Sequence, residues 1–260
     1  MTTDAKVLAE MVGLAPADPA LYLACRVYVQ RFDGDNNPDP ETNGEYDMLR
    51  ATIPACRTVF DVGAHVGGWS EAVVKLNPQV ALHAFEPGAK SFAALAQRGL
   101  PAGVRLNRLA LGATSEQRAL YSFGGHQELS SLYAREAIDG YPVDRSDASE
   151  TVTVTTLDAY CAQHGVAEID FLKIDAEGHD LQVLRGGRGM LARRAVGIVQ
   201  FEYGAANIDS RDLLKDFFDF FAEISYDLLK VRQGGFAPFA RYDARLENFT
   251  YQNWIAARRK

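Results

Sequence analysis

The chain has 260 residues, of which 47% are hydrophobic and 23% charged, a composition typical of a folded domain with a full hydrophobic core. Its net charge of −7 argues against nucleic acid as a partner. No apolar run is long enough for a membrane span, and no signal peptide is expected at the first residues, so we predict a cytoplasmic protein. The widely spaced Cys25, Cys56 and Cys161 predict free thiols.

Residues 1–50 are predicted to form a helical preface, and residues 51–260 the main domain. Apolar side chains recur at helical spacing over 20–30, and a second short helix is expected at 46–50. The helix at 20–30 could pack on its own domain or on a partner chain, which leaves a homo-oligomer open.

Strands and helices alternate over most of the remaining chain, which predicts βαβ units and a parallel sheet in an α/β fold. The predicted strands cover 58–60, 80–85, 104–111, 171–174, 197–201, 224–231 and 253–257, and the predicted helices 70–76, 89–97, 157–164, 178–191 and 211–222. Residues 118–156 interrupt this alternation. We expect a hairpin-like excursion there, with a mobile lid over 124–150 in which His126 could reach the site.

A turn containing glycines, Asp61-Val62-Gly63-Ala64-His65-Val66-Gly67, follows the first predicted strand. Glycines allow a sharp turn and a close approach to a ligand. Glu86 ends the second strand, where a carboxylate can accept hydrogen bonds from the hydroxyls of an adenosine ribose. The turn and this acid together predict a nucleotide-type cofactor at the sheet edge.

These features fit both NAD and S-adenosylmethionine (SAM), and Asp61 favours SAM. A carboxylate attracts the ammonium and sulfonium groups of SAM, whereas it would repel a pyrophosphate. The NAD fingerprint would also place a glycine where His65 stands. A nicotinamide-dependent oxidoreductase is therefore the first alternative, and a non-catalytic SAM-binding protein the second.

Asp175 ends the fourth strand, and we expect it to face the same crevice as Asp61 and Glu86. Acids gathered there require a cation, which could be the cofactor, Mg²⁺ or both. An acceptor hydroxyl also needs a base or a metal. The predicted catalytic residues are Asp175, His179, whose imidazole ordinarily titrates near neutral pH, and Glu202. Asp175 and Glu202 are the predicted Mg²⁺ ligands, and Trp69 and Tyr203 are candidates for lining the acceptor pocket.

Several of these motifs together resemble the FkbM family of methyltransferases over roughly residues 43–257. They are the turn at 61–67, Glu86-Pro87, Ser130-Ser131-Leu132, Thr156-Leu157-Asp158 and the block 169–186, which contains Lys173-Ile174-Asp175-Ala176-Glu177-Gly178. Asn43-Gly44-Glu45 and Glu202 also resemble family positions. The sequence departs from the family at His65, where asparagine is commoner, and at Asp180, where the acid is longer.

The resemblance implies a Rossmann-like class I methyltransferase fold. Its mostly parallel sheet has seven strands in the order 3-2-1-4-5-7-6, the last antiparallel, with helices on both faces. It also implies SAM-dependent O-methylation of a hydroxyl on a secondary metabolite such as a polyketide, or on a sugar or glycan. The predicted cofactor-binding residues are Glu45, Asp61, Gly63, His65, Gly67, Ser70, Glu86, Pro87, Ala110, Ser131 and Asp175.

Overall fold

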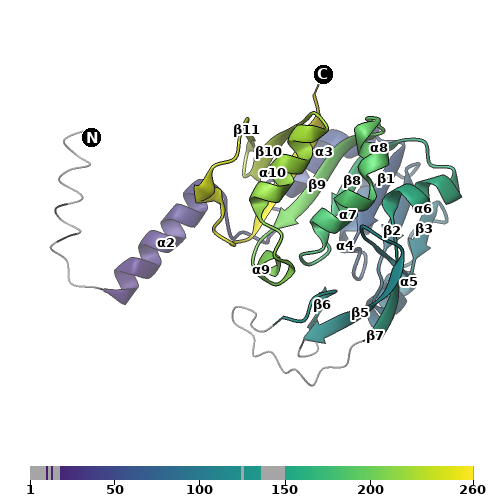
Figure 1. Cartoon of the computed structure of the whole chain (residues 1–260), viewed down its shortest axis with the longest axis horizontal. Helices are drawn as coiled ribbons and strands as arrows, with labels where there is room; N and C mark the ends of the chain where they lie inside the picture. The colour runs from purple at the N-terminus through teal and green to yellow at the C-terminus, as the bar shows by residue number, and fades with distance from the viewer. Residues whose placement is uncertain (1–9, 11–12, 14–17, 124–125, 136–149, 260) are drawn as a thin grey trace.

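The computed structural model describes residues 10, 13, 18–123, 126–135 and 150–259, with the backbone alone at 126–128. Within this part of the chain, an eight-stranded sheet carries the site, and a four-stranded sheet lies beside it (Figure 1). The strands of the main sheet are β1 (Thr58–Val62), β2 (Ala81–Phe85), β3 (Val104–Asn107), β8 (Ile169–Ile174), β9 (Val196–Tyr203), β10 (Tyr226–Arg232), β11 (Gly235–Phe239) and β12 (Gln252–Arg258).

The main sheet has the order β11-β10-β12-β9-β8-β1-β2-β3, which confirms the predicted order. β12 runs antiparallel to both of its neighbours, β9 and β10. β11 is an additional edge strand that pairs with β10 as a hairpin. This strand was not predicted from the sequence, because glycines and Pro238 interrupt its pattern.

Helices cover both faces of the main sheet. They are α3 (Glu45–Thr52), α4 (Gly68–Leu76), α5 (Ala89–Gln97), α6 (Leu157–His164), α7 (Asp180–Gly186), α8 (Arg188–Ala192), α9 (Ala206–Ser210) and α10 (Leu214–Glu223), with 3₁₀ turns at Ile53–Ala55 and Ala244–Leu246. The predicted helix at 178–191 is in fact α7 and α8. A Cβ on Gly186, at the end of α7, would lie 2.0 Å from the Gly112 carbonyl oxygen.

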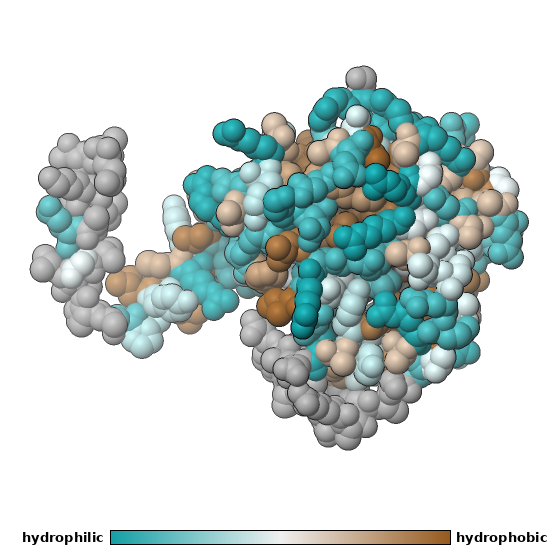
Figure 2. Space-filling model, viewed as in Figure 1, coloured by the Kyte–Doolittle hydropathy of each residue, from teal (hydrophilic) through white to brown (hydrophobic). Residues whose placement is uncertain are grey.

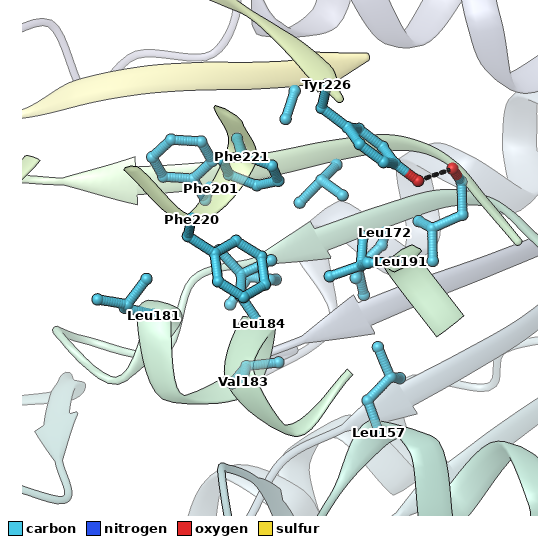
Figure 3. Packing of buried hydrophobic residues seen from close by; sticks show 14 of the residues in the cluster. Leu157, Leu172, Leu181, Val183, Leu184, Leu191, Phe201, Phe220, Phe221 and Tyr226 are labelled. Atoms are coloured by element: carbon cyan, nitrogen blue, oxygen red, sulfur yellow. Dashed lines mark hydrogen bonds between the residues drawn. The ribbon is translucent and has the colours of Figure 1, made fainter. Parts of the chain in front are cut away.

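Alternation along β1 divides the core between the two faces. Phe60 and Val62 join a cluster with α6, α7, α8 and α10, whereas Val59 joins a second cluster with α3 and α4. In the first cluster, Phe201, Phe220 and Phe221 pack together near Leu184 (Figure 3). Because α3 contributes buried residues to the second cluster, the predicted boundary at residue 50 falls inside a helix of the core.

The excursion predicted at 118–156 forms a small sheet together with residues 110–117. Its strands are β4 (Ala110–Leu111), β5 (Glu116–Phe123), β6 (His126–Ser131) and β7 (Glu150–Thr155), in the order β4-β7-β5-β6. The predicted third strand at 104–111 therefore divides between the two sheets. Most of the predicted lid, residues 136–149, and the side chain of His126 lie outside the described residues.

The helix predicted at 20–30 is α2 (Pro19–Asp33), which projects away from the sheets (Figure 1). Asp18 caps its start by accepting a hydrogen bond from the Ala20 amide at 2.8 Å, and Gly34, in the left-handed region, ends it. None of the fifteen residues of α2 is buried. No helix in the described part of the chain has the length and apolar character to cross a membrane.

Candidate active site

A cavity of ≈ 320 Å³ opens at the carboxyl ends of the parallel strands, where ligands bind in open α/β sheets. Its polar wall comes from the segments that follow β1, β2 and β8, and from β9. The residues of that wall are Gly63, His65, Glu86, Asp175, Glu177, His179 and Glu202. Leucines of the excursion and of the segment before it also line the cavity: Leu109, Leu111, Leu120, Leu129 and Leu132.

Gly63 allows the turn after β1 to lie directly against the turn after β8. It has a φ of 83°, and a Cβ at this position would stand 1.8 Å from the Asp175 carbonyl oxygen. The Asp175 amide donates to the Val62 carbonyl at 2.9 Å, and the Gly63 amide donates to the Phe85 carbonyl at 3.0 Å. The turn is thus bonded to both neighbouring strand ends. His65 also has a positive φ, 47°, the conformation that glycine adopts most readily.

Glu86 follows β2 and lies against the same turn. Its Oε2 accepts the His65 amide at 2.9 Å, and its Oε1 accepts the Gly88 amide at 2.8 Å. Burial raises the pKa of Glu86 to about 7, and the two amide hydrogen bonds oppose that rise. Each carboxylate oxygen has lone pairs beyond the one that its amide uses, so a ligand with neighbouring hydroxyls could still donate to it.

Lys173 is a buried cation beneath this wall that was not assigned a role from the sequence. Its Nζ lies 3.0 Å from Asp175 Oδ2 and 3.7 Å from Asp61 Oδ1. The three residues come together because Asp61 and Lys173 are partners across β1 and β8. A lysine between Leu172 and Ile174, in an otherwise buried strand, was the available sequence signal.

Asp61 does not line the cavity as expected. It is fully buried and accepts a hydrogen bond from the Ser70 hydroxyl of α4 at 2.6 Å. The physical reason is strand alternation, which points Asp61 and Val59 toward the α4 layer. Its carboxylate places a negative charge beside the Lys173 ammonium.

Glu202 forms a hydrogen-bonded pair with Tyr251 at the cavity. The Tyr251 hydroxyl donates to Glu202 Oε1 at 3.1 Å and accepts from Asn253 Nδ2 at 2.8 Å. Burial, and then the nearby charge of Asp175, raise the pKa of Glu202 above its usual range. Tyr251 was missed because it precedes β12, far from the motifs in sequence, and only the pairing of β12 with β9 brings it to Glu202.

His179 lines the cavity, but its imidazole does not keep the near-neutral pKa that is ordinary for histidine. It stands at the N-terminus of α7 with 2% of its surface exposed, and its Nδ1 lies 2.9 Å from the Tyr133 hydroxyl. Burial, with a smaller contribution from the Arg118 charge, lowers its pKa to about 3. The imidazole is therefore neutral and weakly basic at physiological pH.

The cavity brings together six of the predicted cofactor-binding residues: Gly63, His65, Glu86, Pro87, Ala110 and Asp175. It leaves out Glu45, Asp61, Gly67, Ser70 and Ser131. Four of these are occupied elsewhere, Asp61 and Ser70 by the hydrogen bond between them. Glu45 accepts from Gln200 Nε2 at 2.7 Å, and the Ser131 hydroxyl donates to the Glu177 carbonyl at 2.8 Å.

The described residues contain no group of three or more His, Cys, Asp or Glu side chains that could hold a metal ion. The Mg²⁺ expected between Asp175 and Glu202 therefore receives no support, and Asp175 already has Lys173 as a cationic partner. Trp69 and Tyr203 do not line the cavity. The Trp69 ring packs beside Phe171, and the Tyr203 hydroxyl donates to Glu247.

A sheet of this strand order, with a glycine turn after β1, an acid after β2 and a carboxylate-lined cavity, defines a Rossmann-like class I methyltransferase of the SAM-dependent kind. The chain belongs to the FkbM methyltransferase family, because the family model described as Methyltransferase FkbM domain matches residues 61–232.

The chain is also similar to a curated relative, the 31-O-demethyl-FK506 methyltransferase FkbM of Streptomyces tacrolimicus. The two are 31% identical over 152 residues, which cover 49% of this chain and 58% of the relative. Among solved structures, an FkbM methyltransferase from Methylobacillus flagellatus KT is 12% identical, with 77% of this chain and 43% of that chain covered and a TM-score of 0.47. A TehB-like SAM-dependent methyltransferase from Corynebacterium glutamicum ATCC 13032 is 14% identical. The match covers 93% of this chain and 100% of that chain, with a TM-score of 0.45.

Proposed function

We propose that this chain is a SAM-dependent O-methyltransferase whose acceptor is a hydroxyl on a small molecule, either a secondary metabolite such as a polyketide or a sugar or glycan. The observation that carries the proposal is the Glu202–Tyr251 pair at the wall of the cavity, close to the carboxylates of the strand ends. The name of the curated relative, a 31-O-demethyl-FK506 methyltransferase, points to the same acceptor group.

The residues of the cavity fit SAM. Glu86 is a buried carboxylate with lone pairs left for two ribose hydroxyls. Asp175, Glu177 and Glu202 add carboxyl oxygens to the same wall, and such oxygens suit an ammonium and a sulfonium. A dinucleotide would instead bring a pyrophosphate to these acids, and like charges repel. When bound, SAM supplies an electrophilic methyl group.

Glu202 is the base that we propose for the acceptor hydroxyl. An alcohol must lose its proton to the protein as its oxygen takes the methyl group, and a carboxylate with a raised pKa is a stronger base than an ordinary one. Tyr251 holds one Glu202 oxygen by its hydrogen bond, which leaves the other oxygen to face the acceptor. His179 is not assigned this role because its pKa is lowered to about 3.

The chain offers a matched pair for testing this assignment. Tyr203 also donates its hydroxyl to a glutamate, Glu247, but neither residue lines the cavity. Glu202→Gln should lower kcat by about 10²–10⁴-fold, and Tyr251→Phe should lower it less, while both leave the affinity for SAM nearly unchanged. Tyr203→Phe and Glu247→Gln should leave kcat close to the wild-type value.

The acceptor assay uses a panel of hydroxylated polyketides and sugars, each beside its deoxy analogue and with SAM as methyl donor. Mass spectrometry should find a methylated product only where the hydroxyl is present. Titration calorimetry with SAM and with NADH completes the test. Binding of NADH without binding of SAM would overturn the proposal, and Glu202→Gln at wild-type kcat would remove Glu202 from the mechanism.

A further inference from the structure

The arm formed by α2 exposes an unusual number of large apolar side chains. Figure 2 shows hydrophobic residues along this projecting helix. Its large exposed apolar residues are Leu21, Tyr22, Leu23, Val27, Tyr28, Val29 and Phe32. A soluble protein rarely leaves such a continuous apolar surface without a function.

Most of these side chains fall on one face. Leu21, Cys25, Tyr28 and Phe32 follow each other at spacings of four, three and four residues, which places them in one row along a helix and is the spacing of a helix–helix seam. Tyr22 and Val29 lie together on one side of this row, whereas Leu23 and Val27 fall on the opposite face of the helix. We call the four residues of the row, together with Tyr22 and Val29, the α2 stripe.

The area of the α2 stripe is of the order that a stable dimer requires. Its aromatic residues, Tyr22, Tyr28 and Phe32, are 68%, 70% and 72% exposed, so together they offer roughly 300–500 Å² at the usual area of an aromatic side chain. Leu21, Cys25 and Val29 add to this. A standard interface buries about 800 Å² on each partner, and much of that lies within the stripe.

The arm is attached to the main domain by specific contacts just after α2. The buried Asp35 pairs with the buried Lys230 of β10, and Asn248 Nδ2 donates to Asp35 at 2.8 Å. The Asn36 amide donates to the Tyr251 carbonyl at 2.8 Å. Because the base of the arm is fixed, the stripe is presented in a defined direction.

We propose that the α2 stripe pairs with the α2 stripe of a second copy of this chain, forming a two-fold homodimer. A single apolar row on a projecting helix can contact its own copy, as two-fold interfaces require. Charge disfavours a lipid surface: Arg26 and Arg31 are offset by Asp18 and Asp33, and the chain carries a net charge of −7. Helices that lie on membranes are typically rich in basic residues.

The oligomeric state of the full chain tests this pairing. Light scattering on a size-exclusion column should give twice the 28.5 kDa of one chain. Tyr28→Glu and Phe32→Glu should each raise the dimer dissociation constant by about 30-fold or more, as expected for aromatic anchors. Phe236→Glu is the matched control, because Phe236 is also an exposed phenylalanine, 49% exposed, but lies on β11. It should leave the dimer intact.

Cys25 provides a second measurement that does not depend on the glutamate variants folding. It is exposed in the middle of the stripe, whereas Cys56 and Cys161 are buried. A short bismaleimide, which alkylates one thiol at each end, should link two wild-type chains at low micromolar concentration. Cys25→Ser should abolish the link while light scattering still finds the dimer.

A wild-type chain that is monomeric at all concentrations would overturn the proposal, as would a dimer that Phe32→Glu does not weaken. Co-sedimentation of a monomer with vesicles of phosphatidylcholine and phosphatidylglycerol would assign the stripe to a lipid surface instead. Because this test uses mass and cross-linking alone, it can fail while the proposed methyl transfer stands, and the reverse also holds.

Discussion

At the scale of single residues, Glu86 couples the site to pH. Burial raises the pKa of this carboxyl to about 7, against about 4.5 in an unfolded chain. Between these values the folded protein holds a proton that the unfolded chain has lost. Glu86 therefore lowers the stability of the ligand-free protein as the pH rises through this range.

Ligand binding should show the opposite dependence. The ionised Glu86 accepts hydrogen bonds from two ribose hydroxyls more strongly than the protonated acid does, because one oxygen of the acid carries a proton. The affinity for S-adenosylhomocysteine should therefore fall below pH 7, by up to about tenfold per pH unit. Titration calorimetry between pH 5.5 and 8 checks this. In Glu86→Gln the affinity should be weaker and its pH dependence reduced. A wild-type affinity that does not change between these limits would contradict the assignment.

Lys173 shows how a single buried charge organises neighbouring strands. Its ammonium lies between Asp61 of β1 and Asp175 after β8, and these charges, Asp175 first, raise its pKa against the effect of burial. From the sequence, we expected the clustered acids to require a cation, supplied by the cofactor or by a metal. In the folded protein, the Lys173 ammonium itself supplies part of the positive charge that these acids require.

At the scale of elements, Gly63 in the turn after β1 and Gly68 at the first position of α4 form a contrasting pair. A Cβ on Gly63 would meet the Asp175 carbonyl, whereas a Cβ on Gly68 would find nothing within 4 Å. Gly63→Ala should lower the free energy of unfolding by about 2–4 kcal/mol. Gly68→Ala should raise it by about 0.5–1 kcal/mol, because alanine is the better helix former.

Urea unfolding of the two variants measures both effects. If Gly63→Ala were as stable as the wild type, the close approach of Gly63 to the Asp175 carbonyl would not constrain this turn. A comparable loss of unfolding free energy in Gly68→Ala would show that the contact with Asp175 is not the cause of the loss in Gly63→Ala.

Elements with a clear periodic pattern were predictable from the sequence. Ala89–Gln97 and Leu157–His164 have the predicted bounds. The order of the main sheet, which the family resemblance implied rather than any periodic pattern, also agrees. The predictions that failed concern features that depend on contacts between distant parts of the chain. The division of the predicted third strand and the position of Tyr251 are set by pairings with β7 and β9, and such pairings leave no local pattern to read.

The site was predictable to the same degree. Glu86, Asp175 and Glu202 follow from the positions where strands end, and all three line the cavity. Asp61 was misplaced because strand alternation directs it to the α4 layer. The pKa of His179 could not be foreseen, because it depends on burial beneath Tyr133 and near Arg118, which only the folded excursion brings together.

At the scale of the whole molecule, the Asp35–Lys230 pair joins the preface to the main sheet. Both side chains are buried, with 5% and 1% of their surfaces exposed. Asp35→Asn would leave the Lys230 ammonium buried without its counter-charge and should cost about 3–5 kcal/mol of unfolding free energy. The double variant Asp35→Leu with Lys230→Met should recover much of that loss.

Chemical denaturation of the full chain gives these values. The control is the exposed pair Arg188–Glu223, with side chains 55% and 57% exposed, where Glu223→Gln should change stability by less than about 1 kcal/mol. Equal losses in Asp35→Asn and Glu223→Gln would show that the preface is not held by its buried ion pair.

The place of β12 has a consequence for how the protein is made. This strand follows β10 and β11 in the chain, yet it lies between β9 and β10 in the sheet. A ribosome therefore completes both neighbours before the strand that joins them, and in the interval each exposes an unpaired edge. Unpaired edges attract strands of other chains, so aggregation during synthesis should depend strongly on how quickly residues 252–258 emerge and dock.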